Sequence, residues 1–257
     1  EYSGLRPGEK LYEELLIGDN CVGTSHPKIT RALESHLETN HLKSLLSSLG
    51  TATDKHQHSH VLELMKEAGI NTIRVYEPID DIKVLDQLYD SGIKVVIGFG
   101  YNQRGRFDIV SGTFINYIRK YKDHEAILMW ELGNEYNYNA QWFDGDINNW
   151  YKAMEFVAQI IQSEDSSRLV SSAHGDLPSN DALRIASSIQ VWGMNVYRWD
   201  KPASIFEEWK AVSDKPMYFA ELGADSYMTK STSKYQKGEN QQAQADANKV
   251  ILNEVLV

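Results

Sequence analysis

The sequence of 257 residues has a single cysteine, few prolines and no long apolar run. Cys21 has no second cysteine to pair with, so no intramolecular disulfide is possible and we interpret it as a plain small residue. No stretch approaches the roughly 18 uninterrupted apolar residues of a transmembrane helix, so we expect no membrane insertion. The first ten residues also lack the apolar region of a signal peptide. Nothing in the sequence predicts an oligomeric state.

An excess of positive charge is also missing. The formal net charge is −10, whereas nucleic-acid binding normally requires a basic patch, so we expect no nucleic-acid partner. No GxGxxG or GxxxxGK[ST] motif follows a candidate strand, which removes the usual indication of a nucleotide-binding sheet. Apolar residues make up 42% and charged residues 24%, as in an ordinary globular protein.

From His60 onward, amphipathic segments alternate with short runs of β-branched and apolar residues, and this alternation is typical of βα units. Parallel strands need such crossover connections, so the pattern predicts an α/β fold with a parallel sheet. A doubly wound sheet and a closed barrel are the alternatives. The candidate strands are residues 71–76, 93–100, 126–132, 168–173, 189–197 and 216–222.

Polar side chains cluster where these strands end, which favours a (β/α)8 TIM barrel, because active sites of that fold lie at the carboxyl ends of its strands. The strand ends carry Arg74, Tyr76, Tyr101, Asn102, Asn134, Glu135, His174, Asn195, Tyr197 and Glu221. Two glutamates that each end a barrel strand can converge on one rim, and a pair of carboxyl groups is what glycoside hydrolysis requires.

Residues 1–52 follow a different pattern, with polar helical stretches and no clear strand. Residues 53–59 are polar and predict a linker, and residues 60–257 form the barrel part. His56, His58 and His60 alternate in the linker and at its end, as in some zinc sites. No HExxH motif and no third ligand accompany them, so we predict a solvated linker and no metal.

Four segments of the barrel part, NTIRVY (71–76), WELGNEYNY (130–138), WGMNVYRW (192–199) and PMYFAELGAD (216–225), resemble clan A glycoside hydrolases. This clan includes β-galactosidases, β-1,3-glucanases and β-1,3-glucanosyltransferases. The resemblance implies a retaining mechanism on a carbohydrate substrate without a cofactor, and an extracellular or periplasmic location. It also implies that Glu135, preceded by Asn134, is the acid/base and Glu221 the nucleophile, with Arg74 and Tyr197 supporting Glu221.

The resemblance to clan A glycoside hydrolases also predicts an incomplete barrel. NTIRVY corresponds to the second strand and PMYFAEL to the seventh, so strands two to seven are present and strand eight is missing. A first strand is not evident, although LLIGDNCV (15–22) is a candidate for that place.

Further residues are candidates for substrate binding or support. Four aromatic residues that follow the catalytic strands could form sugar platforms or simply pack in the core, namely Tyr136, Tyr138, Trp142 and Trp199. His174 has two alternatives, a hydrogen bond to substrate or to another side chain. We expect Glu131, four residues before Glu135, to lie deeper in the barrel, bonded to another polar group. The candidates are Tyr101, Tyr138, Trp142, His174, Asn195 and Trp199.

A second resemblance concerns the N-terminal segment. GLRPGEKLYEELLIGDN with HPKI (26–29) resembles the C-terminal region of nucleotide-sugar 4,6-dehydratases and epimerases of polysaccharide biosynthesis, in which Arg6 would reach the pyrophosphate. Because neither Rossmann glycines nor a substrate domain accompany it, we interpret this segment as a remnant or fusion.

Three hypotheses follow. The first is a retaining glycosidase or transglycosidase acting on a β-linked oligo- or polysaccharide such as a β-glucan. The second is an inactive carbohydrate-binding barrel fragment, and the third is a dehydratase. Hydrolysis of an aryl β-glycoside would favour the first over the second, whereas NAD retained on purification would favour the third.

Overall fold

The computed structural model describes residues 21–23, 30–32, 41, 44–45, 48–49, 58–198 and 201–255, without the side chains of 21–23, 30–32 and 58–59. The helices are α2 (His58–Glu67), α3 (Ile82–Asp90), α4 (Phe114–Tyr121), α5 (Ile147–Glu164), α6 (Asn180–Ile185), α7 (Ser204–Val212) and α8 (Gln241–Val255), with short 3-10 turns η1 (Tyr136–Tyr138) and η2 (Ala140–Phe143). The strands are β1 (Cys21–Gly23), β2 (Thr30–Ala32), β3 (Thr72–Val75), β4 (Lys94–Phe99), β5 (Ile127–Asn134), β6 (Val170–Gly175), β7 (Val191–Val196), β8 (Met217–Leu222), β9 (Tyr227–Met228) and β10 (Gly238–Glu239).

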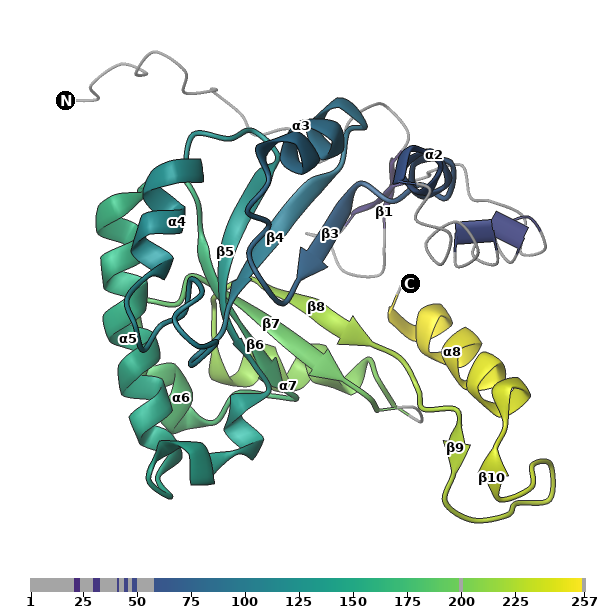
Figure 1. Cartoon of the computed structure of the whole chain (residues 1–257). Coiled ribbons are helices and arrows are strands. Elements are labelled where there is room, and N and C mark those ends of the chain that lie inside the picture. The colour runs from purple at the N-terminus through teal and green to yellow at the C-terminus, as the bar shows by residue number, and fades with distance from the viewer. Residues whose placement is uncertain are drawn as a thin grey trace.

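Six parallel strands form the central sheet, in the order β3-β4-β5-β6-β7-β8. Each strand pairs with the next one along the chain, and the sheet curls as a part of a barrel does (Figure 1). The predicted α/β barrel fold is therefore confirmed, and the doubly wound alternative, which requires a reversal of strand order, is excluded. All six predicted strands are present, and β5 continues two residues beyond the predicted end, to Asn134.

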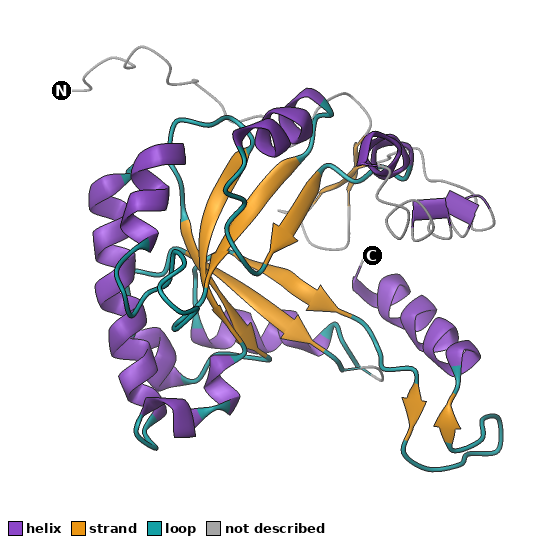
Figure 2. Ribbon diagram, in the orientation of Figure 1, coloured by secondary structure: helices purple, strands orange, loops and turns teal. Residues whose placement is uncertain are grey.

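Helices α4, α5 and α6 lie along one side of the curled sheet (Figure 2), and the hydrophobic core fills the space between these layers. Trp130 of β5, Trp150 of α5 and Trp192 of β7 are fully buried there. The ring of Phe99 stacks on Trp130 with centroids 5.8 Å apart. Helix α5 begins where Asp146 accepts a hydrogen bond from the backbone N–H of Asn148, so its start is fixed by an N-cap. This packing gives the strands a rigid support.

The two outer strands of the sheet are open to solvent. Every residue of β8 is half-buried, and β3 has one exposed residue followed by three half-buried ones. In contrast, β6 and β7 are buried throughout. Within the part of the chain that the structure describes, β3 pairs only with β4 and β8 only with β7. The described part of the chain therefore forms an incomplete barrel, as the sequence predicted.

The N-terminal segment is described only in part. Cys21–Gly23 pairs antiparallel with Thr30–Ala32 and not with β3, while residues 15–20 of the candidate first strand lie outside the described residues. Leu45 packs against Leu64 of α2. Helix α2 begins at His58, so the last two residues of the predicted linker are helical. The domain boundary and the dehydratase resemblance stay predictions.

The C-terminal helix α8 is tied to the chain that follows β8. Asn248 Oδ1 accepts a hydrogen bond of 3.0 Å from the backbone N–H of Ala224, and Gln244 donates to the Ala224 carbonyl. Between β8 and α8, the strands β9 and β10 form a small antiparallel hairpin. None of the helices in the described ranges is both long enough and apolar enough to cross a membrane.

Candidate active site

The carboxyl ends of β3, β5, β7 and β8 bring most of the predicted site residues together. Arg74 lies on β3, Asn134 ends β5 and Asn195 lies on β7. Asn195 is paired in register with Glu221 of β8. Because neighbouring parallel strands end at the same edge of a sheet, these side chains share one rim of the incomplete barrel.

Glu221 accepts hydrogen bonds on both carboxylate oxygens. Oε1 receives Arg74 Nη1 at 3.0 Å and the Tyr76 hydroxyl at 2.8 Å, and Oε2 receives the hydroxyl of Tyr197. Burial would raise the pKa of Glu221, but the hydrogen bonds from Tyr197 and Tyr76 and the charge of Arg74 lower it on balance. The carboxylate is therefore kept ionised and fixed in orientation, as a nucleophile must be.

The side chain of Arg74, only 13% exposed, binds three groups at once. Its Nε donates to Glu131 at 2.6 Å, Nη1 donates to Glu221, and Nη2 donates to Asn134 Oδ1 at 2.8 Å. Burial would lower the pKa of Arg74, but the carboxylate of Glu131 raises it, so the guanidinium stays charged. This planar fork links the strands β3, β5 and β8, of which no two are neighbours in the sheet.

Glu135 has an unusual backbone conformation. It lies in the left-handed region at φ 53° and ψ 27°, two residues after Gly133 at φ 67°. A side chain at Gly133 would come within 2.7 Å of Trp150, so this position requires glycine. Left-handed backbone at a residue other than glycine costs on the order of 1–3 kcal/mol and tends to cluster at functional sites. Glu135 is thus the first residue after β5, at the turn where the chain leaves the strand.

A chain of hydrogen bonds connects the two candidate catalytic carboxylates. Arg74 binds both Glu221 and Asn134, and the Asn195 side chain donates to Asn134 Oδ1 at 3.1 Å and to Glu135 Oε1 at 3.0 Å. The pKa of Tyr197 is raised, first by its hydrogen bond to Glu221 and also by the charges of Glu221 and Glu135. Both carboxylates thus lie within electrostatic reach of one hydroxyl.

The aromatic candidates occupy different environments. Tyr138 and Trp142 are exposed, at 62% and 56%, beyond the end of β5. Tyr101 is half-buried, with its ring 4.9 Å from Phe143, so it packs in an aromatic cluster. Tyr136 belongs to the same cluster and accepts a hydrogen bond of 3.1 Å from the Tyr101 N–H. Trp199 lies outside the described residues.

His174 is buried and faces protein groups on both ring nitrogens. Nδ1 donates to the carbonyl oxygens of Gly175 and Asp176, at 3.1 and 3.2 Å, so Nε2 is left to accept from the Tyr151 hydroxyl at 3.4 Å. Burial lowers the pKa of His174, which keeps the ring neutral. Of the two alternatives that the sequence left open, these contacts favour bonding within the protein.

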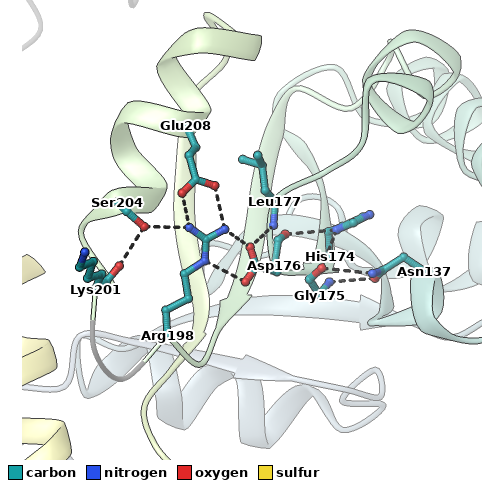
Figure 3. A network of polar contacts seen from close by, with 9 residues as sticks. All are labelled: Asn137, His174, Gly175, Asp176, Leu177, Arg198, Lys201, Ser204 and Glu208. Atoms are coloured by element: carbon teal, nitrogen blue, oxygen red, sulfur yellow. Dashed lines mark hydrogen bonds and ion pairs between the residues drawn. The ribbon is translucent and has the colours of Figure 1, made fainter.

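A network around Arg198 joins the loops after β6 and β7 (Figure 3). The guanidinium binds Asp176 with two of its nitrogens, one of them 3.0 Å from Oδ2, and Glu208 at 2.6 and 2.9 Å. Asn137 adds hydrogen bonds to the backbone of Gly175, at 2.8 and 3.1 Å. Because Arg198 follows Tyr197 directly, this network fixes the end of β7 beside the donor to Glu221.

Replacing Arg198 by Met should lower the free energy of unfolding at pH 7 by about 1–2 kcal/mol, because partly exposed ion pairs are worth less than buried ones. Burial would raise the pKa of Asp176, but Arg198 lowers it. A lowered folded-state pKa stabilises the fold above the unfolded value near ~3.9, and this contribution disappears as the pH falls through the folded pKa. The difference in the free energy of unfolding between variant and wild type, measured with urea, should therefore shrink at about pH 3.

The exposed pair Arg184–Asp181 supplies the control, because its side chains are 70% and 59% exposed. Arg184→Met should stay within about 0.5 kcal/mol of wild type. The account of the network would be contradicted if Arg198→Met lost no more unfolding free energy than Arg184→Met. A loss that grows as the pH falls would contradict it as well.

Sequence reasoning missed three parts of the site. Tyr76 is predicted at a strand end but not as a partner of Glu221, although two residues that are separated by one position in an extended chain point to the same side, as Arg74 and Tyr76 would. The pairing of Arg198 with Asp176 has no sequence signal beyond charges near strand ends. Glu131 lies deep in the barrel as expected, yet its bond to Arg74 was not foreseen. Among the described side chains, no group of three His, Cys, Asp or Glu is placed to hold a metal ion.

Comparison with known proteins gives a family match. Residues 106–248, more than half of the chain, match the sequence model of the family described as glycosyl hydrolases family 2, TIM barrel domain. This range includes both glutamates and the four strands β5 to β8. A search of the curated proteins found no match.

Several solved structures share the fold. The β-glucuronidase of Bacteroides uniformis superposes with a TM-score of 0.60 at 18% identity, over 75% of this chain and 25% of that one. An FMN-binding β-glucuronidase from Facaelibacterium prausnitzii L2-6 has a TM-score of 0.55 at 16% identity, over 78% and 32%. An active-site mutant of the Rhizomucor miehei β-1,3-glucanosyltransferase, in complex with laminaritriose, has a TM-score of 0.52 at 16% identity, over 76% and 75%. The chain thus spans about a quarter of the first of these enzymes.

Proposed function

The chain belongs to the family 2 glycosyl hydrolases, in their TIM barrel domain, and from this premise we propose that it cleaves β-glycosidic bonds of an oligo- or polysaccharide with retention of configuration. Family membership supports a function of glycoside hydrolase type. The retaining mechanism, the clan A assignment and the roles of single residues are the further content of the proposal.

One observation carries the proposal. Glu221 is an ionised carboxylate held by Arg74, Tyr76 and Tyr197, and the hydrogen bonds of Arg74, Asn134 and Asn195 connect it to Glu135 on the same rim. A retaining glycosidase needs one carboxylate as nucleophile and a second carboxyl group as proton donor. The surroundings of Glu221 suit the first role, and Glu135, which accepts a hydrogen bond from the neutral side chain of Asn195, suits the second.

The reaction would proceed in two steps. A Glu221 oxygen attacks the anomeric carbon and forms an ester while the bond to the leaving oxygen breaks, and Glu135 gives its proton to that oxygen. Glu135, now a carboxylate, then removes a proton from water, whose oxygen attacks the anomeric carbon and releases Glu221. If a sugar hydroxyl replaces water, the outcome is transglycosylation.

Two classes of substrate suit the comparisons. The superposing enzymes include β-glucuronidases and a β-1,3-glucanosyltransferase, and the motifs resemble enzymes that act on β-glucans. Exposed Tyr138 and Trp142 at the rim offer faces on which sugar rings can stack. We favour a β-linked glucan as the substrate.

The test is an activity panel. Aryl β-glucoside, β-galactoside, β-mannoside and β-glucuronide are incubated with the chain, together with laminari-oligosaccharides, and the anomer released first is identified by proton NMR. Retention with at least one substrate supports the proposal. An inverted product would contradict it, as would the absence of turnover in a folded chain that binds the sugars.

Removing the hydroxyl of Tyr197 or Tyr76 should lower kcat/KM by about 10–100-fold, because Glu221 loses a group that orients it. Loss of a donor also raises the pKa of Glu221. The acidic limb of the kcat/KM profile should therefore move to higher pH by roughly one unit in Tyr197→Phe and Tyr76→Phe.

The exposed residue Tyr227, which follows β8 by five residues, provides a matched control. Tyr227→Phe should leave the acidic limb in place. If the limb moves to lower pH in Tyr197→Phe, its hydroxyl does not stabilise the charged form of Glu221.

A second candidate function, sugar binding without turnover, is favoured by the open edges of β3 and β8. A barrel with unpaired outer strands can keep part of a binding surface without holding both carboxylates in reacting positions. Calorimetric binding of laminari-oligosaccharides with no hydrolysis of any activated aryl glycoside would favour this alternative.

A further inference from the structure

Glu131 is a buried carboxylate to which the proposed reaction assigns no role. Its side chain is 1% exposed, although charged groups are seldom buried without a reason. It lies on β5 four residues before Glu135, and an Arg74 nitrogen and the Tyr218 hydroxyl donate to its oxygens. Burial of a carboxylate in such a place costs stability unless partners compensate, so its contacts need an explanation.

The contacts of Glu131 lead directly to the candidate nucleophile. Arg74 donates Nε to Glu131 at 2.6 Å and Nη1 to Glu221 at 3.0 Å, so the two carboxylates bind one rigid guanidinium. The donors of a guanidinium lie in one plane and move together. A hydrogen bond at one of them therefore limits the rotation of the whole group. Anchored at Nε, the same plane presents Nη1 to Glu221 and Nη2 to Asn134.

We infer that Glu131 is a positioning residue, which fixes Arg74 against Glu221 and Asn134 and whose negative charge limits how strongly Arg74 stabilises the charge of Glu221. This rests on the proposed role of Glu221 as the nucleophile. An arginine without a countercharge would make Glu221 a weaker base and so a poorer nucleophile. Glu131 keeps the arginine in place while it offsets part of that effect.

The surrounding groups agree with an electrostatic coupling of the two carboxylates. Burial raises the pKa of Glu131, Arg74 and the Tyr218 hydroxyl oppose this, and the charge of Glu221 raises it further. Glu221 in turn is faced by Tyr197, Tyr76 and Arg74. Arg74 also has Tyr218 and Tyr76 near it. Coupling between two sites is reciprocal, so the charge of Glu131 must raise the pKa of Glu221 equally.

Glu131→Gln tests the charge while it preserves the shape. The amide oxygen can still accept from Arg74, and the amide nitrogen can donate to the Tyr218 oxygen, whose proton can turn to Ser171 at 2.9 Å. In the chain labelled with ¹³C at the glutamate side-chain carboxyls, the titration of Glu221 is followed by NMR. We expect its midpoint to fall by on the order of one pH unit in Glu131→Gln.

Two further variants complete the measurement. Glu131→Asp keeps the charge and should leave the Glu221 midpoint near that of wild type. In Glu221→Gln, the midpoint of Glu131 should fall by the same amount as that of Glu221 in Glu131→Gln, and this arm needs no change at position 131. The resonances are assigned from their loss in each Gln variant.

A Glu221 midpoint that stays constant in Glu131→Gln, together with an unchanged Glu131 midpoint in Glu221→Gln, would overturn the inference and leave Glu131 a purely structural role. The titration needs no turnover, so it is separate from a failure of the proposed function, which would appear in the substrate panel. Where turnover is measured, the acidic limb of kcat/KM should move to lower pH in Glu131→Gln, opposite to the shift in Tyr197→Phe.

Discussion

Replacing Glu221 by Ala should lower turnover of every glycoside by about 10⁴-fold or more, because the proposed covalent intermediate forms on this carboxylate. Good leaving groups will not restore the rate, since the missing step is the attack itself. Steady-state kinetics with an activated aryl glycoside and with an oligosaccharide measure the loss on both.

Glu125 offers a matched control, because it is exposed and precedes β5 at the opposite end from Glu135. Glu125→Ala should retain wild-type rates. Appreciable activity in Glu221→Ala, on either substrate, would remove Glu221 from the nucleophile role.

Replacing Glu135 by Ala should have an effect that depends on the leaving group. General acid catalysis contributes about 10²–10⁴-fold, so oligosaccharides should slow by that factor, whereas dinitrophenyl glycosides, which leave without a proton, should still form the glycosyl intermediate. Azide can occupy the space of the lost carboxyl group and attack this intermediate. The expected product is a glycosyl azide with the configuration of the substrate, identified by NMR.

The Glu221→Ala variant is the control for this rescue, because azide should not accelerate it to give a product of retained configuration. Equal losses in Glu135→Ala for good and poor leaving groups, with no response to azide, would show that Glu135 is not the acid/base.

The fold could be predicted because its signals are local and repeated. Buried parallel strands such as β4 and β7 appear in the sequence as continuous apolar runs, and the helices between them keep the three-to-four spacing of an amphipathic surface. The absence of phosphate-binding motifs and the polar strand ends then favoured the barrel. The N-terminal residues carry no comparable periodicity, so the sequence left their place in the fold open.

The site could be predicted only as far as strand ends indicate it. Arg74, Asn134, Asn195 and Glu221 each end or nearly end a strand, and parallel strands bring such ends together. The contacts of Tyr76 and Glu131 depend on the orientation of side chains across the rim. The positions of the strands in the sequence do not specify that orientation. The left-handed backbone at Glu135 and the close approach of Gly133 to Trp150 likewise have no signal in strand order.

The central claim, that Glu221 attacks the sugar, is tested most directly by trapping the intermediate. The chain is incubated with 2-deoxy-2-fluoro-β-glycosyl fluorides of glucose, galactose, mannose and glucuronic acid, whose glycosyl-enzyme esters hydrolyse slowly. Peptide mass spectrometry then locates the label. We predict one glycosyl group on Glu221 and none on the Glu221→Gln variant. A label on a different residue, or no label from the sugar whose aryl glycoside is hydrolysed, would contradict the account.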